Sequence, residues 1–281
     1  MPELPETETI ARDLHDAIVN AVIIDVAVQR ADVLREVSSQ TLTAAVDHAR
    51  ILRVWRRAKN VVLDLAIGTK TTPSSHLVVQ PRFTGSLLLD DGTLPPDRLD
   101  YLAVTFALQD GRSLHYRDVR RLGTVAWMSA KRFDEYEAKL GREPLDVALT
   151  DAEFSALVRA SRRSVKAVLM DQSRLAGVGN IYANEALWLA GIDPSREAAD
   201  LGDDETARLL RELRAVLRAS IAARGTSFRD YRDARGQRGD FLSQLSVYGR
   251  GGEPCLRCGK RLIETHAVDG RTTVFCAVCQ S

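Results

Sequence analysis

The sequence predicts an α+β protein in which an antiparallel sheet domain comes first, a helical domain follows and a small metal-binding module ends the chain. Three observations predict this order. Short apolar runs separated by turn residues fill the first half, helical apolar patterns follow, and the four cysteines are confined to positions 255–279. The length of 281 residues, with 45% hydrophobic and 27% charged residues, fits one large or two ordinary folded domains.

A short helix is expected before the strands. Pro5 suits the first turn of a helix, and Ile10, Leu14 and Ile18 then fall on one face. This start has no basic segment followed by an apolar one, and no apolar run approaches the length of a membrane span. We therefore expect a cytoplasmic protein without a membrane partner.

Closely spaced strands are expected next. Apolar and β-branched runs predict strands at 21–28, 61–67, 77–79, 86–89, 101–108, 113–116 and 124–128. Asp-Gly pairs at 91–92 and 110–111 lie between such runs and predict hairpin turns. Many short strands with short connections favour an antiparallel sandwich or barrel.

The pattern becomes helical after a polar stretch at 131–150, which we interpret as a linker. Thr150 and Glu153 form a capping-box pattern that predicts the start of a helix. Further helices are expected from Ser164, over 181–190, and from about 203 to 225. The stretch at 225–239, rich in Gly, Arg and Asp, is interpreted as a mobile loop.

The cysteines form two Cys-x-x-Cys pairs, Cys255 with Cys258 and Cys276 with Cys279. In a cytosolic chain this pattern indicates metal binding rather than disulfides. Four thiolates around one Zn²⁺ leave no open coordination position, so the predicted zinc site is structural. A module this small needs the metal to fold. Zinc modules serve many purposes, so this motif alone does not identify a function.

Net charge gives no indication of a nucleic-acid partner, because the formal value is only +1. Local basic clusters do occur, and each fits a DNA-contacting surface or an ordinary solvated face equally well. The clusters comprise Arg50, Arg53, Arg56, Arg57 and Lys59; Arg112, Arg117, Arg120 and Arg121; and Arg224, Arg229, Arg232, Arg235 and Arg238.

The start of the chain carries reactive residue types. Methionine is normally removed before a small residue, which would leave Pro2 with a free secondary amine. An α-amino group titrates near pH 8 (about 7.7–8.0), so a useful fraction is neutral and nucleophilic at physiological pH. Glu3 and Glu6 lie within a helical turn and can transfer protons. Taken alone, the same residues also fit an acidic helix cap.

Several motifs together resemble the formamidopyrimidine-DNA glycosylase family over nearly the whole chain. They are PELPE at 2–6, RRAK at 56–59, DVRR at 118–121, GVGNIY at 177–182, VYGR at 247–250, RTTVFC at 271–276 and the two Cys-x-x-Cys pairs. The resemblance implies an N-terminal antiparallel β-sandwich with a leading helix, a C-terminal domain of helix–two-turns–helix type and a terminal zinc-finger hairpin. The implied boundaries are 1–130 for the catalytic sandwich, 131–150 for the linker, 151–240 for the helical domain and 241–281 for the zinc finger.

The resemblance also implies an activity in base excision repair. Pro2 would attack C1′ of an oxidised purine nucleotide, expel the base and cleave the strand by β,δ-elimination through a Schiff base. Glu3 would act as the acid that assists sugar-ring opening, Lys59 would reach the phosphate and lesion, and Arg271 would hold the flanking phosphates. The implied partner is double-stranded DNA containing oxidised bases, bound by a monomer, and the implied metal is one structural Zn²⁺.

Further DNA contacts follow from the same resemblance. Asn180 opens a helix after a glycine-rich turn, where backbone amides favour a phosphate, although an N-cap role also fits. Glu6 would support the surroundings of the nucleophile, and Tyr248 would contact the DNA backbone. Three side chains would fill the space left by the extruded nucleotide: Phe83, Arg120 and Leu122. The family more commonly has Met and Phe at the first and third of these positions, and both apolar residues also fit a buried core. The loop at 225–239 resembles the family's lesion-capping loop.

Two other functions remain as alternatives. An endonuclease VIII-like glycosylase would act on oxidised pyrimidines, but that branch usually has Gly at the position of Leu4. A DNA-damage binding protein without activity would not need Pro2 and Glu3.

Overall fold

The computed structural model describes residues 2–281 of the protein, and contacts between residues divide the chain into two units. The first unit contains the chain up to Ala138 together with Ile221–Leu242, and the second contains Lys139–Ser220 and Ser243–Ser281. The contacts place 221–240 with the first unit, whereas the predicted boundaries, which stay a prediction, place this segment with the helices. The physical reason lies in contacts that 224–231 makes with the first helix, described with the site below.

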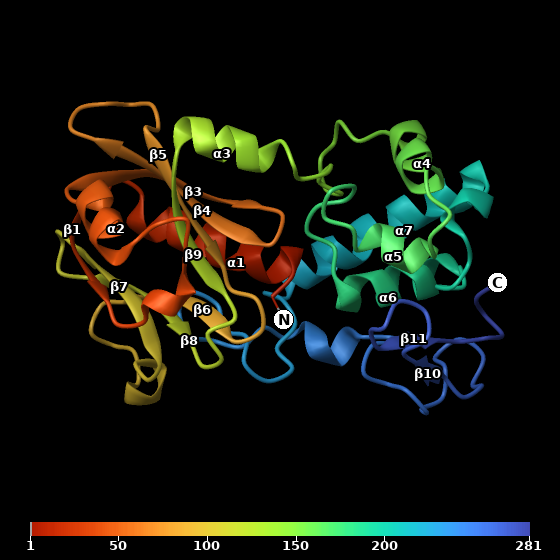
Figure 1. The fold of residues 1–281 in the computed structure, drawn as a ribbon. Coiled ribbons are helices and arrows are strands. Elements are labelled where there is room, and N and C mark those ends of the chain that lie inside the picture. Colours follow the sequence, from red (N-terminus) through yellow and green to blue (C-terminus); the bar gives the residue numbers. More distant parts are fainter. Residues whose placement is uncertain (1) are drawn as a thin grey trace. The chain divides into compact units, whose positions relative to one another are not determined.

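Two sheets form the β-sandwich of the first unit (Figure 1). The four-stranded sheet has the order β1 (Ile23–Val28), β7 (Leu102–Leu108), β8 (Ser113–Asp118), β6 (Gly85–Asp90). The five-stranded sheet has the order β2 (Leu34–Arg35), β9 (Thr124–Ser129), β5 (Ser75–Gln80), β4 (Asn60–Ile67), β3 (Ala49–Arg57). Every pairing between these strands is antiparallel apart from β2 with β9, so the predicted antiparallel sandwich is confirmed with one short exception.

Helix α1 (Leu4–Ile18) packs into the core that the two sheets share. Ile10, Leu14 and Ile18 are completely buried there, as the helical periodicity predicted. Phe106 and Leu114 from the four-stranded sheet belong to the same core, together with residues of β3, β4 and β5 from the five-stranded sheet. The N-terminal helix is therefore fixed to the sandwich along one whole face.

One of the two predicted hairpins is correct. Residues 110–111 connect β7 to β8, where Gly111 has a φ of +88° and the Leu108 amide donates to Arg112 O at 2.9 Å. Residues 91–92 do not form a hairpin, because β6 pairs with β8 rather than with β7. The connection instead contains the short 3₁₀ helix η2 (Pro96–Arg98). Strand order depends on pairing across the sheet, which turn residues alone do not specify.

Five further elements of the first unit were not predicted. They are η1 (Ala31–Val33), strand β2, α2 (Ser39–Val46), strand β3 and α3 (Ala130–Glu137). Helix α3 occupies the start of the predicted linker. Its Phe133 is buried and stacks on His76 of β5, with ring centroids 4.1 Å apart, so this part of the chain packs on the sheet rather than connecting domains.

The second unit contains α4 (Asp151–Arg159), α5 (Val165–Leu169), α6 (Asn180–Ala190) and η3 (Ala198–Asp200), followed by α7 (Asp203–Ala222) and η4 (Phe241–Gln244) at the two chain crossings between units. The predicted capping box of α4 is present, with the Glu153 amide donating to Thr150 Oγ1 at 3.2 Å. Gly191 ends α6 with a φ of +70°, a conformation that favours glycine.

A two-stranded hairpin, β10 (Ile263–Thr265) with β11 (Thr273–Phe275), carries the end of the chain. It shares a small core with Trp188 of α6, which includes Val247, Leu262 and Val274. Arg257 stacks on the Trp188 ring at 4.2 Å and donates to Trp188 O and Leu189 O at the end of α6. Within residues 2–281, no helix is both long and apolar enough to span a membrane.

Candidate active site

Pro2 and Glu3 are buried immediately before α1, where Glu3 is the N-cap residue. Glu3 and Glu6 are each only 1% exposed, and the Glu3 amide donates to Glu6 Oε2 at 2.8 Å. The start of the helix therefore fixes Glu3 relative to Glu6. The predicted removal of Met1 lies outside the described residues.

Glu6 also joins this start to a segment more than 200 positions away. Its second oxygen, Oε1, accepts a hydrogen bond from the Thr226 amide at 2.7 Å. Gly225 lies against the same side chain with a φ of +87°, and a Cβ there would be 3.0 Å from Glu6 Cγ. Tyr231 is buried, and its hydroxyl lies within donating distance of Glu6 O (3.4 Å) and Arg224 O (3.1 Å). The loop at 225–239 is thus anchored to the residue that holds Glu3.

Arg224 adds a second attachment between this loop and α1. Its guanidinium forms ion pairs with Asp13 of α1 and with Asp233 of the loop, which is completely buried. Asp233 also accepts hydrogen bonds from the amides of Arg235 and Gln237, at 3.0 and 2.8 Å. These contacts group the segment with the first unit, although the sequence predicted a mobile loop of the helical domain.

Lys59 lies in the two-residue turn of the β3–β4 hairpin rather than in a simple run before β4. Ala58 supplies the turn with a φ of +55°, and Asn60 Nδ2 donates to Arg57 O at 3.0 Å. Arg56 of the same hairpin pairs with Glu8 of α1 at 2.8 Å. Burial alone would raise the pKa of Glu8, but the guanidinium groups of Arg56 and Arg12 together outweigh burial and lower that pKa. The hairpin that presents Lys59 is therefore fixed to the helix that follows Pro2.

Three side chains were predicted to fill the space left by the extruded nucleotide, and they are called the wedge residues. They lie on two neighbouring loops, 81–84 and 119–122, called the wedge loops. Phe83 is 48% exposed and Leu122 is 38% exposed, so the interpretation of both as core residues is wrong. The Arg120 guanidinium lies over the Phe83 ring at 5.5 Å. The structure thus brings Phe83 and Arg120 together as an exposed pair, with Leu122 on the same loop as Arg120.

Asp118 holds both wedge loops, a role that the sequence did not reveal. It is 1% exposed, and its Oδ1 accepts from the Thr84 hydroxyl in one loop and from the Arg120 amide in the other. Its Oδ2 accepts from the Tyr116 hydroxyl at 3.1 Å and from the Gly123 amide at 2.8 Å. A buried carboxylate with four donors rigidifies what it joins. The one available signal was the position of Asp118 two residues before Arg120.

Asn180 and the hairpin that carries Arg271 meet in the second unit. The Asn180 side chain donates from Nδ2 to Thr272 O at 2.9 Å, so it does not cap its helix, and Gly179 is the N-cap residue instead. Asn184, one turn later, accepts from the Val274 amide at 2.8 Å. Arg271 is exposed beside these contacts. The glycine-rich turn and the hairpin thus present adjacent polar groups.

Lys166 of α5 is a completely buried lysine that sequence inspection overlooked. Its ammonium donates to Thr273 Oγ1 at 2.7 Å, Thr272 O at 3.2 Å and Asp269 Oδ1 at 3.3 Å. These acceptors lie on either side of Arg271. The lysine is a positioning residue for the hairpin, because its three donors are directed to the turn that presents the arginine.

Tyr248 is positioned by Glu185, another buried residue without a sequence signal. Glu185 is 1% exposed and accepts from three consecutive amides, those of Ser246, Val247 and Tyr248, at 2.8–2.9 Å. Burial raises the pKa of Glu185 despite these donors. The predicted backbone contact at Tyr248 is thus attached to α6, the helix that begins at Asn180.

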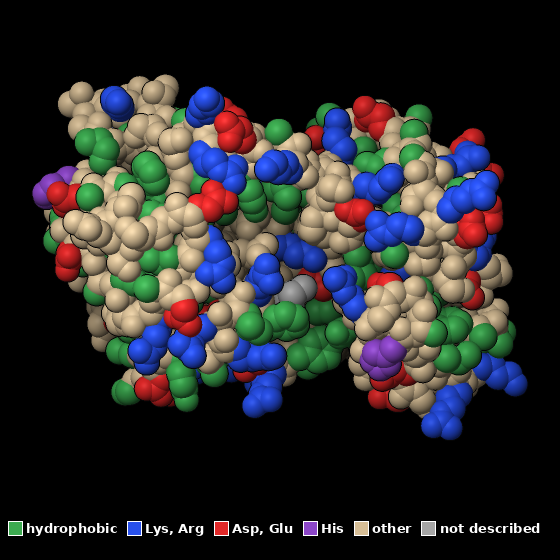
Figure 2. Space-filling view, viewed as in Figure 1, with side chains coloured by type: hydrophobic (Ala, Val, Ile, Leu, Met, Phe, Trp, Pro, Cys, Tyr) green, Lys and Arg blue, Asp and Glu red, His purple; other side chains and the backbone are tan. Residues whose placement is uncertain are grey.

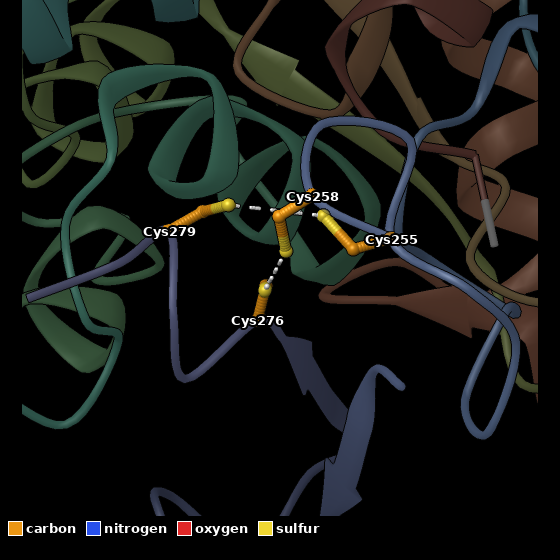
Figure 3. Close-up of side chains that lie close together, drawn as sticks. All are labelled: Cys255, Cys258, Cys276 and Cys279. Atoms are coloured by element: carbon orange, nitrogen blue, oxygen red, sulfur yellow. Dashed lines mark hydrogen bonds between the residues drawn. The ribbon is translucent and has the colours of Figure 1, made fainter. Parts of the chain in front are cut away.

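The four cysteine side chains point toward one another from two loops (Figure 3). All four sulfur atoms lie within 4.8 Å of one another, with Cys255 and Cys279 at 4.0 Å and Cys258 and Cys276 at 3.5 Å. Zinc–sulfur bonds of about 2.3 Å in a tetrahedron place the sulfur atoms about 3.8 Å apart. The observed sulfur separations are close to this value, so the donor set fits zinc.

Several arginines of the basic clusters have structural roles. Arg56 and Arg57 pair with Glu8 and Glu137, and Arg112 pairs with Asp110. Figure 2 shows basic side chains on both units, with acidic ones among them, as expected for a nearly neutral chain. Charge alone therefore does not mark the DNA-contacting surface.

Three domain models match successive parts of the chain. The formamidopyrimidine-DNA glycosylase N-terminal domain matches residues 1–125, its H2TH domain matches 140–232, and the zinc finger found in FPG and IleRS matches 252–281. The formamidopyrimidine-DNA glycosylases of Carboxydothermus hydrogenoformans and Desulfitobacterium hafniense are 40% and 37% identical to the chain, and each match covers 100% of both chains.

Solved structures lead to the same family. The Lactococcus lactis protein in complex with DNA containing an abasic site is 31% identical, with a TM-score of 0.88 over 99% of both chains. Other complexes of the Lactococcus lactis protein contain Fapy-dG DNA or DNA with an oxidised pyrimidine.

The sandwich with its buried Pro2 and Glu3, the helical domain that begins α6 at a glycine-rich turn, and the four-cysteine hairpin define a DNA glycosylase that also has lyase activity at abasic sites. The four cysteines hold one structural zinc ion. The chain belongs to the formamidopyrimidine-DNA glycosylase family.

Proposed function

We propose that this enzyme removes oxidised purines, 8-oxoguanine and formamidopyrimidines, from double-stranded DNA and then cleaves the strand, with Pro2 as the nucleophile. One observation supports this proposal above all. Glu6 accepts hydrogen bonds from Glu3 and from Thr226, so one buried carboxylate positions the residue next to Pro2 and the loop at 225–239. This arrangement suits a nucleophile that works beneath a loop covering the damaged base.

The chemistry follows from a secondary amine near neutral pH. The neutral Pro2 nitrogen attacks C1′, the bond from C1′ to the base breaks, and the base leaves with a proton. Opening of the sugar ring, assisted by proton transfer from Glu3 to O4′, gives an iminium ion between Pro2 and C1′. The iminium acidifies the C2′ proton. Loss of that proton expels the 3′ phosphate, and a second elimination expels the 5′ phosphate.

Phosphate contacts would come from both units. Lys59 presents an ammonium at a hairpin turn that Arg56 and Glu8 fix to α1. In the second unit, Arg271 follows the Asp269 turn, and the amides at the start of α6 are near the same hairpin through Asn180. We assign these residues to the phosphates that flank the lesion, and Tyr248 to another backbone contact.

Extrusion of the nucleotide costs a few kcal/mol. Phe83 and Leu122 are exposed apolar side chains on adjacent loops, so both can enter the vacated space. Arg120, held over Phe83, would face the opposite base and favour cytosine. We also infer that the enzyme acts as a monomer in the cytoplasm, where its DNA substrate would be present.

Borohydride trapping tests the proposal directly. The full-length protein, with loss of Met1 verified by mass, is incubated with an 8-oxoguanine·cytosine duplex and borohydride, and a covalent protein–DNA complex is expected. Pro2→Gly should abolish or strongly reduce strand cleavage while duplex binding persists, because a primary amine replaces the secondary amine of proline. Pro5→Ala is the matched control, because it alters a buried proline in the same helical turn but leaves the nucleophile.

Three outcomes would contradict the proposal. Binding without trapping by the wild-type protein indicates a damage-binding protein, and unchanged strand cleavage by Pro2→Gly excludes this nucleophile. The third outcome comes from trapping on a panel of lesions, each placed opposite all four bases. Preferential trapping on oxidised pyrimidines would favour an endonuclease VIII-like enzyme.

A further inference from the structure

Four arginines gather on the outer face of the four-stranded sheet, the face opposite the core that packs against α1. Arg117 lies on β8 opposite Ser86 of β6, so the two side chains are neighbours on one face of the sheet. Leu87, which follows Ser86, and Tyr116, which precedes Arg117, point to the opposite face and belong to the core. Arg98 ends η2, while Arg232 and Arg238 belong to the loop at 225–239; this group is called the arginine cluster.

The loop reaches this face through specific contacts. The Leu89 amide of edge strand β6 donates to Ala234 O at 2.9 Å, which aligns the loop with the strand. Gly236 lies over η2, and a Cβ built there would be 3.8 Å from the side chain of Arg98. The cluster therefore consists of side chains from a strand, a connecting segment and the loop that covers them.

Hydrogen bonding in the arginine cluster is incomplete. The Nε atoms of Arg98, Arg117 and Arg232 are buried and have no acceptor among the described residues. Ser86 is 1% exposed, and its hydroxyl, on the same face as Arg117, likewise has no partner among them. Buried donors of this kind are rare in folded proteins unless another molecule accepts from them.

Charge in the arginine cluster is also unbalanced. Within residues 2–281, Arg117, Arg232 and Arg238 take part in no ion pair, while Arg98 pairs with its neighbour Asp97. The Asp230 carboxylate partly offsets this positive charge by raising the pKa of Arg232, and it also pairs with Arg229 at 3.8 Å. Burial, followed by repulsion from Arg98, Arg238 and Arg117, lowers the pKa of Arg232. Three like charges acting on one partly buried guanidinium favour an anion between them.

We propose that Arg98, Arg117, Arg232 and Arg238 form a phosphate-binding site with the Ser86 hydroxyl at its base. A phosphate group offers several acceptor oxygens and up to two negative charges, which match the unpaired Nε donors and the excess positive charge. The phosphate belongs to the DNA backbone or to a free anion. This site is additional to the proposed glycosylase chemistry and does not depend on it.

The first experiment uses inorganic phosphate and the full-length protein. Thermal unfolding is followed as phosphate replaces chloride at constant ionic strength, and phosphate should raise the Tm of the wild-type protein. Arg117→Gln and Arg232→Gln should lose this rise. Ser86→Ala should reduce it without a change in charge. Arg235→Gln, an exposed arginine of the same loop, is the matched control and should keep it.

The second experiment distinguishes the two sources of phosphate. Binding of an undamaged duplex is measured against salt concentration for the wild type, Arg232→Gln and Arg132→Gln. Arg132→Gln is the control, because Arg132 lies on α3 and already pairs with Glu36. If the site holds a backbone phosphate, the slope of log K against log salt should fall by about 1 for Arg232→Gln and stay unchanged for the control. An unchanged slope combined with a lost Tm rise identifies a free anion.

The proposal is overturned if the variants respond to phosphate as strongly as the wild type. It is also overturned if the wild type shows no phosphate-dependent rise and Arg232→Gln leaves the salt slope unaltered.

Discussion

The wedge loops of the first unit and the Arg271 hairpin of the second unit are both supported by buried groups, but these groups have opposite charges. Each presents exposed side chains that we propose contact DNA, and each is supported by a buried charged group. Asp118 is a carboxylate that accepts from four donors, whereas Lys166 is an ammonium that donates to three acceptors. The hairpin has a second support, the zinc site, and the wedge loops have none of that kind. In both regions, buried charged groups thus position the side chains that we propose contact DNA.

Removal of zinc should have the largest effect and should separate the two regions. Cys276→Ala leaves three thiolates, and a structural zinc site contributes about 10–16 kcal/mol in small zinc-dependent modules. We expect loss of the metal, disorder of the hairpin and weaker DNA binding, with the β-sandwich intact. Elemental analysis and near-ultraviolet circular dichroism check this. Unchanged metal content would show that the four-thiolate site is wrong.

Replacement of Lys166 tests whether zinc alone supports the hairpin. Lys166→Met leaves the Asp269 carboxylate, which is 11% exposed, without its buried partner. Loss of one member of a buried pair costs about 3–5 kcal/mol, and the metal should offset part of it. We expect lower stability in denaturant and weaker duplex binding with full zinc content. Lys131→Met, at an exposed position on α3, is the control. Equal stability of the two variants would contradict a role for Lys166 in holding the hairpin.

Asp118→Asn should disturb the wedge loops without any second support to compensate. An amide nitrogen at the Oδ2 position would face two donors, Tyr116 and Gly123, at a cost of about 1–3 kcal/mol. If Asp118 positions Arg120, discrimination between cytosine and adenine opposite the lesion should also fall. Thr84→Ser keeps the hydroxyl and should preserve it, whereas Thr84→Val should not. Lower stability with unchanged discrimination between the opposite bases would show that Asp118 stabilises the fold but does not position Arg120.

The smallest expected effect is a pH dependence shared by both units. Arg56 lowers the pKa of Glu8 in the first unit, and Arg196 lowers the pKa of Glu205 in the second. A carboxyl group whose pKa is lowered on folding adds stability above its unfolded pKa and loses it as the pH falls through the folded value. Each pair should contribute about 1 kcal/mol or less, so Arg56→Gln and Arg196→Gln should each flatten the acid side of the stability curve below about pH 5. The free energy of unfolding is measured from pH 3 to 7. Variants that kept the wild-type dependence of this free energy on pH would contradict the prediction.

Local patterns predicted the elements well where burial is governed by neighbours in sequence. The periodicity of α1, the capping box of α4 and Gly191 at the end of α6 all fall where expected. Predictions failed where contacts between segments far apart in the chain determine the structure. Residues 91–92 have the composition of a hairpin turn, yet β6 joins β8, and α3 packs on the sheet where a polar linker was expected.

The sequence by itself determined the chemistry available to this protein. Two Cys-x-x-Cys pairs determine the zinc ligands. The residues Pro2, Glu3 and Glu6, taken together with the other family motifs, indicate the candidate nucleophile and its acid. Tertiary structure alone decided that Thr226 binds Glu6, that Asp118 joins two loops, and that Phe83 and Leu122 are exposed. These depend on contacts between segments far apart in the chain, and the free energy of such contacts exists only once the whole core has packed.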